Sequence, residues 1–388
     1  MQRNVQTDTE RRMVRVATFN ASLNRAKAGL LLKDLQTDTN QQARTIAETI
    51  QRLRPDVLAL QEFDYDAEGA GITAFQNNYL NRKQGDERPI HYPFVYAPPV
   101  NTGVSSGVDL DGQGGTEGPN DAFGFGRFPG QYGFVILSRF PIDRPLIRTF
   151  QMVRWADLRG AKLPTDSDGH PYYSKDATDV FRLSSKNHVD VPIKIHGARI
   201  HMLVSHPTPP VFDGPENRNG LRNHDEIKLW TEYINGSSSM SFSDDAGARH
   251  GLPPGTPFVL LGDLNADPVD GESVDGAINQ LLKHPRVHPA VAVGELVPTS
   301  SGGAANGVKY PDHRGRPEHD TAEWGLRVDY VLPSIELVPR ASGIFWPASN
   351  EPAAHLVAKT IDGKSATDHR LVWVDIEIDV DAQSQHKK

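Results

Sequence analysis

The stretch FVLLGDLN, residues 258–265, joins a short apolar run directly to polar side chains. Phe258 to Gly262 is typical of a buried strand because apolar residues follow one another without helical spacing. Asp263 comes next, and Asn265 lies two residues further on. Polar groups at the end of a strand in a rigid sheet often form a binding or catalytic site. This stretch therefore predicts a buried strand that carries functional residues at its end.

The same arrangement recurs along the chain, with strand-like runs that end in a residue able to bind a cation or move a proton. These runs and their terminal residues are Val14 to Phe19 with Asn20, Val57 to Gln61 with Glu62, and Arg199 to Ser205 with His206. Two more acidic positions accompany later β-rich runs, Asp329 within residues 327–332 and Asp368-His369 before residues 370–378. Because strand ends converge on one rim of a layered fold, we expect these side chains to meet there.

Helical patterns lie between the strands. Apolar residues fall at helical spacing over residues 40–54, where Pro55 ends the run, and residues 220–235 are closed by Gly236. Strand and helix patterns alternate, which predicts a mixed α/β fold.

No break in this pattern divides the chain, so we expect a single domain over residues 13–380. A polar lead-in (1–12) and a polar tail (381–388) flank it. Residues 101–130 are rich in Gly and predict a long irregular insertion, and residues 299–325 predict a second loop.

The composition excludes several classes of protein. The 388 residues are 37% hydrophobic and 23% charged, which is typical of a globular chain rather than a disordered one. No run approaches the roughly 18 apolar residues that a membrane-spanning helix needs, and the polar start, MQRNVQTDTERR, lacks the apolar core of a secretory signal. With no cysteine, the chain has no disulfide, no thiolate nucleophile and no Cys-ligated metal.

Charge and cysteine content also bear on partners and location. The 41 basic and 49 acidic side chains give a net charge of −8, which does not favour tight sequence-independent binding of nucleic acid. The absence of cysteine favours an extracellular or periplasmic location, although cytosolic chains can also lack it. The sequence does not determine an oligomeric state.

The motifs at these strand ends resemble those of the endonuclease/exonuclease/phosphatase superfamily, which includes deoxyribonucleases, inositol polyphosphate 5-phosphatases and sphingomyelinases. The matching motifs are Thr18-Phe19-Asn20, Leu60-Gln61-Glu62, Ile136 to Ile142, Ser205-His206, Gly262-Asp263-Leu264-Asn265, Val328-Asp329-Tyr330 and Thr367-Asp368-His369. Thr367 stands where the family usually has Ser, and its hydroxyl preserves the chemistry.

The resemblance implies a four-layered α/β sandwich, two packed mixed β-sheets flanked by helices. It also implies hydrolysis of a phosphate ester by water with the help of Mg²⁺ or Mn²⁺, or of Ca²⁺. Asn20, Glu62 and Asp368 are the metal ligands that the resemblance implies, and their hard oxygen atoms suit Mg²⁺.

The resemblance also implies roles for the remaining strand-end residues. His369 is the general base or a transition-state stabiliser oriented by Asp329, and Asp263 orients or deprotonates the attacking water. Asn265 donates to the phosphoryl oxygens, and His206 does the same or acts as the acid. Which histidine is acid and which is base stays open at this point.

Three further features are expected near the site. Arg222 is either a substrate contact or an exposed arginine on a solvated helix face, and Tyr132 lies near the position where relatives contact phosphate. Phe123, Phe125 and Trp324 are candidates to line a pocket, although aromatic residues in Gly-rich loops more often pack the loop against the body of the domain.

The Gly-rich insertion contains a candidate structural calcium site. Asp109, Asp111 and Gln113 place oxygen atoms at alternate positions, as in the start of a calcium loop. Asn120 occupies the twelfth position, where such a loop needs an acidic residue, so a flexible acidic loop is the alternative.

We therefore expect a metal-dependent phosphodiesterase or phosphomonoesterase that acts on a small phosphate ester. One alternative is a nuclease that cleaves DNA or RNA. A second is a lipid phosphodiesterase, for which Ile344-Phe345-Trp346-Pro347 is a short candidate membrane contact, although these residues fit a strand end and the core better. A third, of another class, is a non-catalytic binding protein on the same fold.

Overall fold

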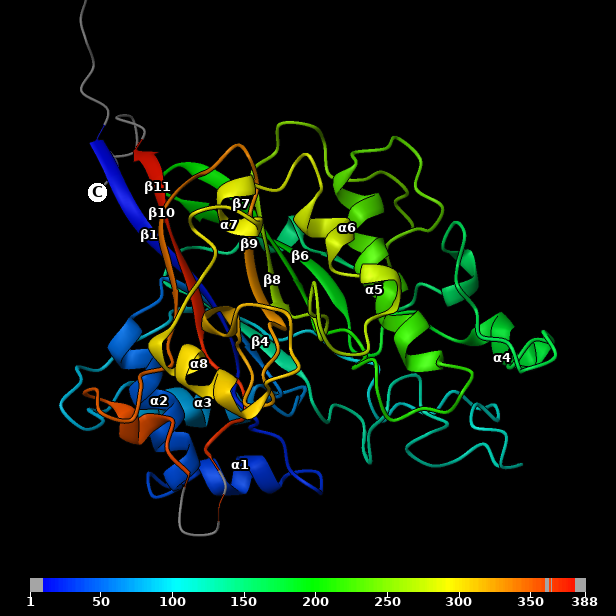
Figure 1. Cartoon of the computed structure of the whole chain (residues 1–388), viewed down its shortest axis with the longest axis horizontal. Coiled ribbons are helices and arrows are strands. Elements are labelled where there is room, and N and C mark those ends of the chain that lie inside the picture. Colours follow the sequence, from blue (N-terminus) through cyan, green and yellow to red (C-terminus); the bar gives the residue numbers. More distant parts are fainter. Residues whose placement is uncertain (1–9, 360–362, 364, 381–388) are drawn as a thin grey trace, which may run out of the picture.

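The computed structural model describes residues 10–359, 363 and 365–380. Two mixed β-sheets pack face to face, and helices cover their outer faces (Figure 1). The six-stranded sheet has the order β10-β11-β1-β2-β4-β3, and the five-stranded sheet has the order β5-β6-β7-β8-β9. The α/β class and the four-layered sandwich are confirmed.

The bounds of the elements are as follows. The strands are β1 Glu10–Asn20, β2 Val57–Gln61, β3 Phe94–Tyr96, β4 Phe134–Ser138, β5 Arg148–Thr149, β6 His188–Ile195, β7 Ala198–Ser205, β8 Phe258–Asp263, β9 Asp329–Pro333, β10 Val338–Ile344 and β11 Val372–Val380. The α-helices are α1 Leu30–Leu35, α2 Gln41–Leu53, α3 Ala70–Phe75, α4 Lys175–Val180, α5 Arg218–Ile234, α6 Asn279–Leu282, α7 Pro289–Ala292 and α8 Ser301–Asn306. A π-helical turn, η1 Gln76–Leu80, follows α3, and 3₁₀ turns lie at η2 Arg144–Leu146, η3 Trp155–Asp157, η4 Val274–Gly276, η5 Gly307–Lys309, η6 Pro317–His319 and η7 Ala354–Leu356.

The layering follows from the alternation of side chains along each strand. In β1, Val14 and Val16 point into the core between the sheets, whereas Ala17 and Phe19 point toward the cluster that contains α1 and α2. In β8, Val259 and Leu261 contribute to the core between the sheets, whereas Phe258 and Leu260 pack in the cluster that contains α5. Since successive residues of a strand face opposite sides, a run of apolar residues predicts a strand covered on both faces.

Two parallel strand pairs bring the site together. β1 pairs in parallel with β2, and β7 pairs in parallel with β8. Parallel neighbours need a crossover, which α1 and α2 provide in the first case and α5 in the second. The carboxyl ends of each pair therefore lie together at one end of their sheet. β1 packs against β8, so the two ends adjoin.

Several predicted boundaries needed correction. β1 begins at Glu10, inside the predicted lead-in, because residues 10–12 continue the antiparallel ladder with β11. The predicted loop at 299–325 contains a short helix, α8, whose first turn is capped by the Ser300 hydroxyl. The predicted helices are observed at 41–53 and 218–234, and the Gly-rich segment 101–130 contains no helix or strand. The rest of the lead-in and the predicted tail lie outside the described residues.

Residues 344–347 belong to the core rather than to a membrane contact. Ile344 and Trp346 are both buried in the cluster between the sheets, and Phe345 packs against the cluster near α2. Among the described residues, no helix has both the length and the hydrophobicity needed to cross a membrane.

Candidate active site

The predicted site residues occupy corresponding strand ends. Asn20 is the last residue of β1 and Glu62 follows β2, while His206 follows β7 and Asp263 ends β8. Asp329 opens β9 directly opposite Asp263 in the antiparallel ladder. The segment 367–369 enters β11 beside the end of β1, where Thr18 pairs with Val372.

The motif around Asp263 depends on a close approach of two strands. Gly262 has φ of 152°, and a Cβ atom there would lie 2.0 Å from the carbonyl oxygen of Ser205. Only glycine allows β7 and β8 to come this near, so that His206 and Asp263 can meet. This contact explains the glycine in the Gly-Asp-Leu-Asn motif.

Asp263 is the centre of the site, and only 1% of its surface is exposed. Its Oδ2 atom accepts a hydrogen bond from Asn20 Nδ2 at 3.0 Å and lies 3.3 Å from His206 Nε2 and 3.6 Å from His369 Nε2. Its Oδ1 atom accepts from the backbone N–H of Asn265 at 3.0 Å. Burial would raise the pKa of Asp263, but the charges of the two histidines and the hydrogen bonds from His206 and Asn20 outweigh it and hold the pKa below its usual range.

His369 forms a buried pair with Asp329. Its Nδ1 atom lies 2.9 Å from Asp329 Oδ2, and the Thr321 hydroxyl accepts from the backbone N–H of Asp329 at 3.0 Å. Burial disfavours the imidazolium, but the charges of Asp329 and Asp263 outweigh it and raise the pKa of His369 to about 10. The Trp324 ring packs against the imidazole at an interplanar angle of 85°, with 5.0 Å between the ring centroids. The pair holds Nε2 of the imidazole toward Asp263.

His206 has the opposite electrostatic character. Burial lowers its pKa, and the nearby charge of Lys186 lowers it further, against the attraction of Asp263. Its Nδ1 atom is buried and has no hydrogen-bond partner among the described residues. The site thus contains one imidazole whose environment favours the charged form and one whose environment favours the neutral form.

Two of the three predicted metal ligands, Glu62 and Asp368, lie at the more open side of the same site, whereas Asn20 is buried. Glu62 Oε2 accepts from Asn24 Nδ2 at 2.8 Å, and Asp368 Oδ1 accepts from the Ser22 hydroxyl at 3.3 Å. Both carboxylates line the cavity described below. Their hard oxygen atoms suit Mg²⁺ or Mn²⁺, so the donor set fits such an ion.

Asn20 links the two halves of the site. Its Nδ2 atom donates to Asp263, and its Oδ1 atom accepts from the backbone N–H of Ser22 at 3.1 Å. The Thr367 hydroxyl donates to the carbonyl oxygen of Asn20 at 2.8 Å and accepts from the backbone N–H of His369 at 3.1 Å. Thr367 therefore supplies the hydroxyl contacts expected at this position.

Three site residues have a strained backbone. Glu62, Tyr132 and Asn265 have φ of 55°, 57° and 52°, in the left-handed region that side chains other than glycine rarely occupy. Each such residue costs on the order of 1 kcal/mol or more, and such strain concentrates at functional sites. The sequence gives no sign of it.

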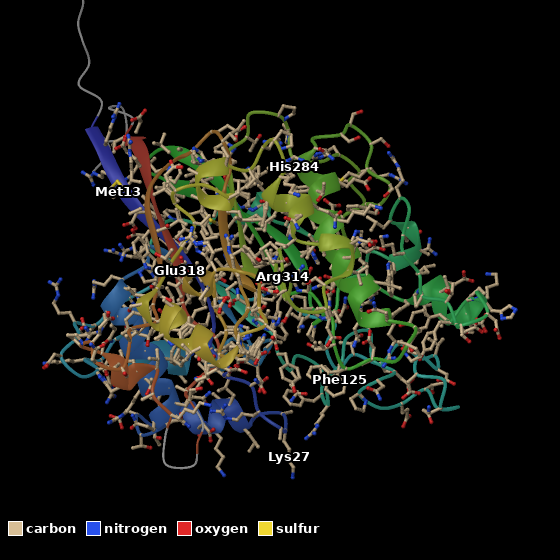
Figure 2. All side chains as sticks on the ribbon, in the orientation of Figure 1. Met13, Lys27, Phe125, His284, Arg314 and Glu318 are labelled. Carbon is tan, nitrogen blue, oxygen red and sulfur yellow. The ribbon has the colours of Figure 1, made fainter. Side chains whose placement is uncertain are left out.

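A cavity of about 1240 Å³ opens beside these residues. Its walls include the Gly-rich segment and residues 208–219, which follow β7. Phe125 and Trp324 line the cavity as predicted, and Phe125, 53% exposed, lies at the surface (Figure 2). Tyr132 also lines the cavity, and its contact with phosphate stays a prediction. Phe123 was also a candidate for the cavity wall but does not line it. It is buried in the core, and its ring stacks under the Arg182 guanidinium.

Arg222 also lines the cavity, but most of its donors are occupied. Its Nε atom donates to the carbonyl of Leu183, and Nη2 donates to those of Phe123 and Arg182. It is 6% exposed, so the alternative of an exposed arginine on a solvated helix face is wrong. These contacts favour a structural role that joins α5 to the cavity wall, and the substrate contact stays a prediction.

The Gly-rich segment gathers a different acidic group from the one predicted. Asp109 and Asp111 lie with Asp121 so that one carboxylate oxygen from each falls within 4.8 Å of the others. Gln113 contributes a backbone N–H that donates to Asp111 Oδ1 at 3.0 Å. Asp109 likewise accepts from two backbone N–H groups of the loop. The carboxylates thus stabilise the turns of the loop, and calcium binding stays a prediction.

Sequence reasoning missed several residues at the site. Lys186 and Arg218 line the cavity, Asn24 donates to Glu62, and Glu226 is buried behind the wall. Glu226 accepts from the backbone N–H groups of Ser185 at 2.7 Å and Thr208 at 2.6 Å. Lysine and glutamate are usually solvated, so nothing in their sequence context marks them as buried.

The chain belongs to the endonuclease/exonuclease/phosphatase family, whose model matches residues 17–369. Members of this family are typically phosphoester hydrolases, and phosphoester hydrolysis is therefore the reaction class that the membership indicates. The match spans every strand-end motif considered above.

A solved structure shares the fold at low sequence identity. The endonuclease/exonuclease/phosphatase from Beutenbergia cavernae DSM 12333 is 14% identical, with a TM-score of 0.51, and the match covers 95% of this chain and 72% of that one. Sphingomyelinase C from Streptomyces griseocarneus is 17% identical, with a TM-score of 0.48 and coverage of 94% and 99%. A comparison with curated protein sequences gave no match.

Proposed function

We propose that this chain hydrolyses phosphate esters of small molecules, monoesters or diesters, in a reaction that depends on a divalent metal. The observation that carries the proposal is Asp263, whose Oδ2 atom faces Asn20, His206 and His369 at the end of a cavity. A buried carboxylate between two imidazoles is suited to orienting water and moving its proton.

Glu62, Asp368 and Asn20 would hold Mg²⁺ or Mn²⁺. When bound, such an ion supplies positive charge beside the phosphoryl and departing oxygens. Glu62 and Asp368 line the cavity directly, which supports their assignment as ligands.

The other side chains act on water and on phosphate. Asp263 orients the attacking water, and His206, whose environment favours the neutral imidazole, accepts its proton. His369, fixed by Asp329, donates from Nε2 to a phosphoryl oxygen and stabilises its growing charge. Asn265 donates from Nδ2 to the Pro207 carbonyl at 3.2 Å, which leaves one amide hydrogen for the substrate.

The shape of the cavity favours a small substrate over a polymer. Loops from residues 101–130 and 208–219 form its walls, whereas a nucleic acid needs an extended basic groove. The net charge of −8 also opposes a polyanion.

The test measures initial rates at neutral pH with Mg²⁺, Mn²⁺ or Ca²⁺ on a phosphomonoester, a phosphodiester and plasmid DNA. We expect cleavage of a small ester that disappears in chelator and in Asp263→Ala. Rapid nicking of DNA would instead favour the nuclease alternative. Absence of turnover with every metal and substrate would favour the non-catalytic alternative.

A further inference from the structure

Among the described lysines and arginines, Lys186 and Arg222 are buried and line the cavity, and they differ in how many hydrogen bonds their donors make. Arg222 donates to three backbone carbonyls, as described above. Lys186, which is 6% exposed, makes one long contact, from Nζ to the Pro207 carbonyl at 3.5 Å. Within the described residues, no carboxylate lies within the 4.0 Å ion-pair distance of this ammonium group. Since an ammonium has three donors, most of its hydrogen-bonding capacity is unused.

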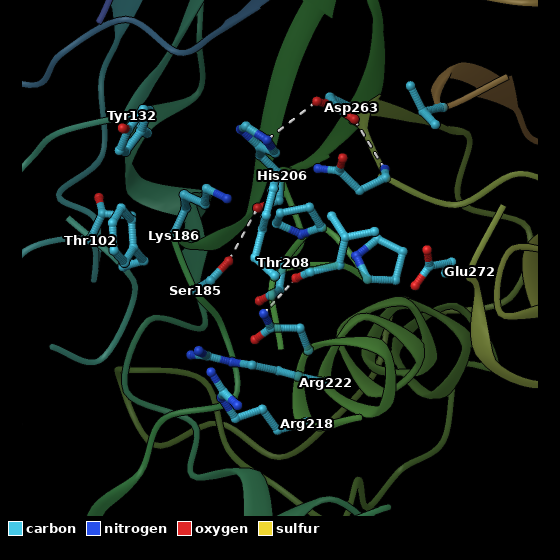
Figure 3. Close-up of a pocket in the computed structure, with 18 of the residues that line it drawn as sticks. Thr102, Tyr132, Ser185, Lys186, His206, Thr208, Arg218, Arg222, Asp263 and Glu272 are labelled. Carbon is cyan, nitrogen blue, oxygen red and sulfur yellow. Dashed lines mark hydrogen bonds and ion pairs between the residues drawn. The ribbon is translucent and has the colours of Figure 1, made fainter. Parts of the chain in front are cut away.

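The Lys186 side chain extends toward His206 at the inner end of the cavity (Figure 3). It also lies within electrostatic range of Asp263 and Glu62, so it belongs to the same cluster as the reacting groups. Lys186 therefore lines the same cavity as the proposed reacting groups.

The protein holds Lys186 in this position through a buried carboxylate. Glu226 accepts from the backbone N–H of Ser185, next to Lys186, and from that of Thr208, two residues after His206. One side chain of α5 thus fixes both the segment before β6 and the segment after β7. Its charge also partly offsets the cost of burying the lysine.

A poorly paired buried ammonium is unfavourable for folding. Burial lowers the pKa of Lys186, against the attraction of Glu226, which reflects this cost. Such costs persist mainly where a ligand needs the group.

We propose that Lys186 is a substrate-binding residue whose Nζ atom donates to a non-bridging oxygen of the phosphoryl group. This inference rests on the proposed function for the identity of the anion. It adds to that function a fixed cation, supplied by the protein, that recognises phosphate independently of the bound metal. A compact ammonium suits a phosphoryl oxygen as a point charge.

The test measures the affinity of the full chain for inorganic phosphate by isothermal titration calorimetry. The titration is done at constant ionic strength, once with Mg²⁺ and once with chelator. Lys186→Met keeps the length and apolar stem of the side chain but removes the charge. We expect phosphate affinity to fall about tenfold or more, the effect of losing a charged hydrogen bond in a buried site. Lys194→Met, at the far end of β6, is the matched control because Lys194 is exposed and pairs with Asp143.

Thermal unfolding separates binding from a structural role. We expect the melting temperature of Lys186→Met to stay equal to that of the unaltered chain or to rise, because the cost of burying the charge is gone. Unchanged phosphate affinity in this variant would overturn the proposal, whether or not the melting temperature falls. Lys186→Gln, which keeps a donor for Pro207, gives the same comparison if the methionine variant does not fold.

The outcome is separable from that of the proposed function because phosphate binding requires no turnover. Binding that depends on Lys186 in a chain that hydrolyses no ester would support this inference and refute the hydrolase proposal. If the chain hydrolyses an ester and Lys186→Met leaves phosphate binding unchanged, the hydrolase proposal is supported and the inference about Lys186 is refuted. An unaltered chain that binds no phosphate in either condition would also overturn the inference.

Discussion

The two sheets contribute unlike halves to one site. The five-stranded sheet supplies His206, Asp263 and Asp329, which are between 1% and 4% exposed. The six-stranded sheet supplies the buried Asn20 and the partly buried Glu62, and the exposed Asp368 lies just before its strand β11. The first half is buried and fixed by mutual hydrogen bonds. The two carboxylates of the second half are accessible to water, as a Mg²⁺ ion that keeps several waters requires. The difference predicts that substitutions in the five-stranded sheet, the dry half, alter proton transfer and stability. Substitutions of the accessible carboxylates, the open half, should alter metal affinity.

The largest effect is expected in the dry half, for Asp263→Asn. The substitution keeps the shape of the side chain but removes the charge between two imidazoles, so kcat/KM should fall about a thousandfold or more. Steady-state kinetics at saturating metal measure it. Asp143→Asn is the control, because Asp143 is a buried carboxylate that pairs with Lys194 and Arg199 elsewhere. Activity within tenfold of the unaltered enzyme would refute the central role of Asp263.

The second prediction concerns the pH dependence of stability in the same sheet. His188 of β6 is fully buried, and burial lowers its pKa to about 4. Between about pH 6.5 and about pH 4 the unfolded chain binds a proton there that the folded chain does not, so stability falls as the pH falls. The contribution is up to about 3 kcal/mol across this window.

Denaturant unfolding of the unaltered chain and of His188→Gln at several pH values isolates that contribution. The stability difference between the two proteins should shrink as the pH falls through this range. Parallel pH profiles would show that His188 has the same pKa in the folded and unfolded chains, which would refute the prediction.

The third prediction moves to the open half. Glu62→Gln removes one of the two carboxylates assigned to the metal, so the Mg²⁺ concentration for half-maximal activity should rise about a hundredfold. Metal titration of chelator-treated enzyme measures it. Glu68→Gln, which alters an exposed glutamate, should leave the metal requirement unchanged. A lower kcat at saturating metal with an unaltered requirement would place Glu62 in the chemistry rather than in metal binding.

The smallest effect is expected for Asn24→Ala. Asn24 donates to Glu62 Oε2 and orients the carboxylate, so its loss should raise the metal requirement about tenfold. The same titration tests this. An effect equal to that of Glu62→Gln would mean that Asn24 binds the metal itself.

Much of the fold and of the site was accessible from the sequence. The strand ends at Asn20, Glu62 and Asp263 are marked locally, because an apolar run that stops at a carboxylate or an amide predicts both a strand and its functional end. The mixed α/β class follows from the alternation of strand and helix patterns, and the four layers follow from the family resemblance. The strands, their functional ends and the fold class can therefore be predicted from short segments of the sequence.

Other features depended on contacts between distant segments. Asp263 can contact His206 because Gly262 lets β7 come close to β8. The pair of His369 with Asp329 joins residues that are 40 positions apart in the chain. The burial of Lys186 depends on loops far from it in sequence, and burial is what makes its charge informative. The local sequence pattern therefore predicted which residues could take part in catalysis. Tertiary packing determined which side chains are buried, which residues have a strained backbone and which charged groups have few hydrogen-bond partners. The reason is physical: desolvation and Coulomb energies depend on the surroundings of a group in space.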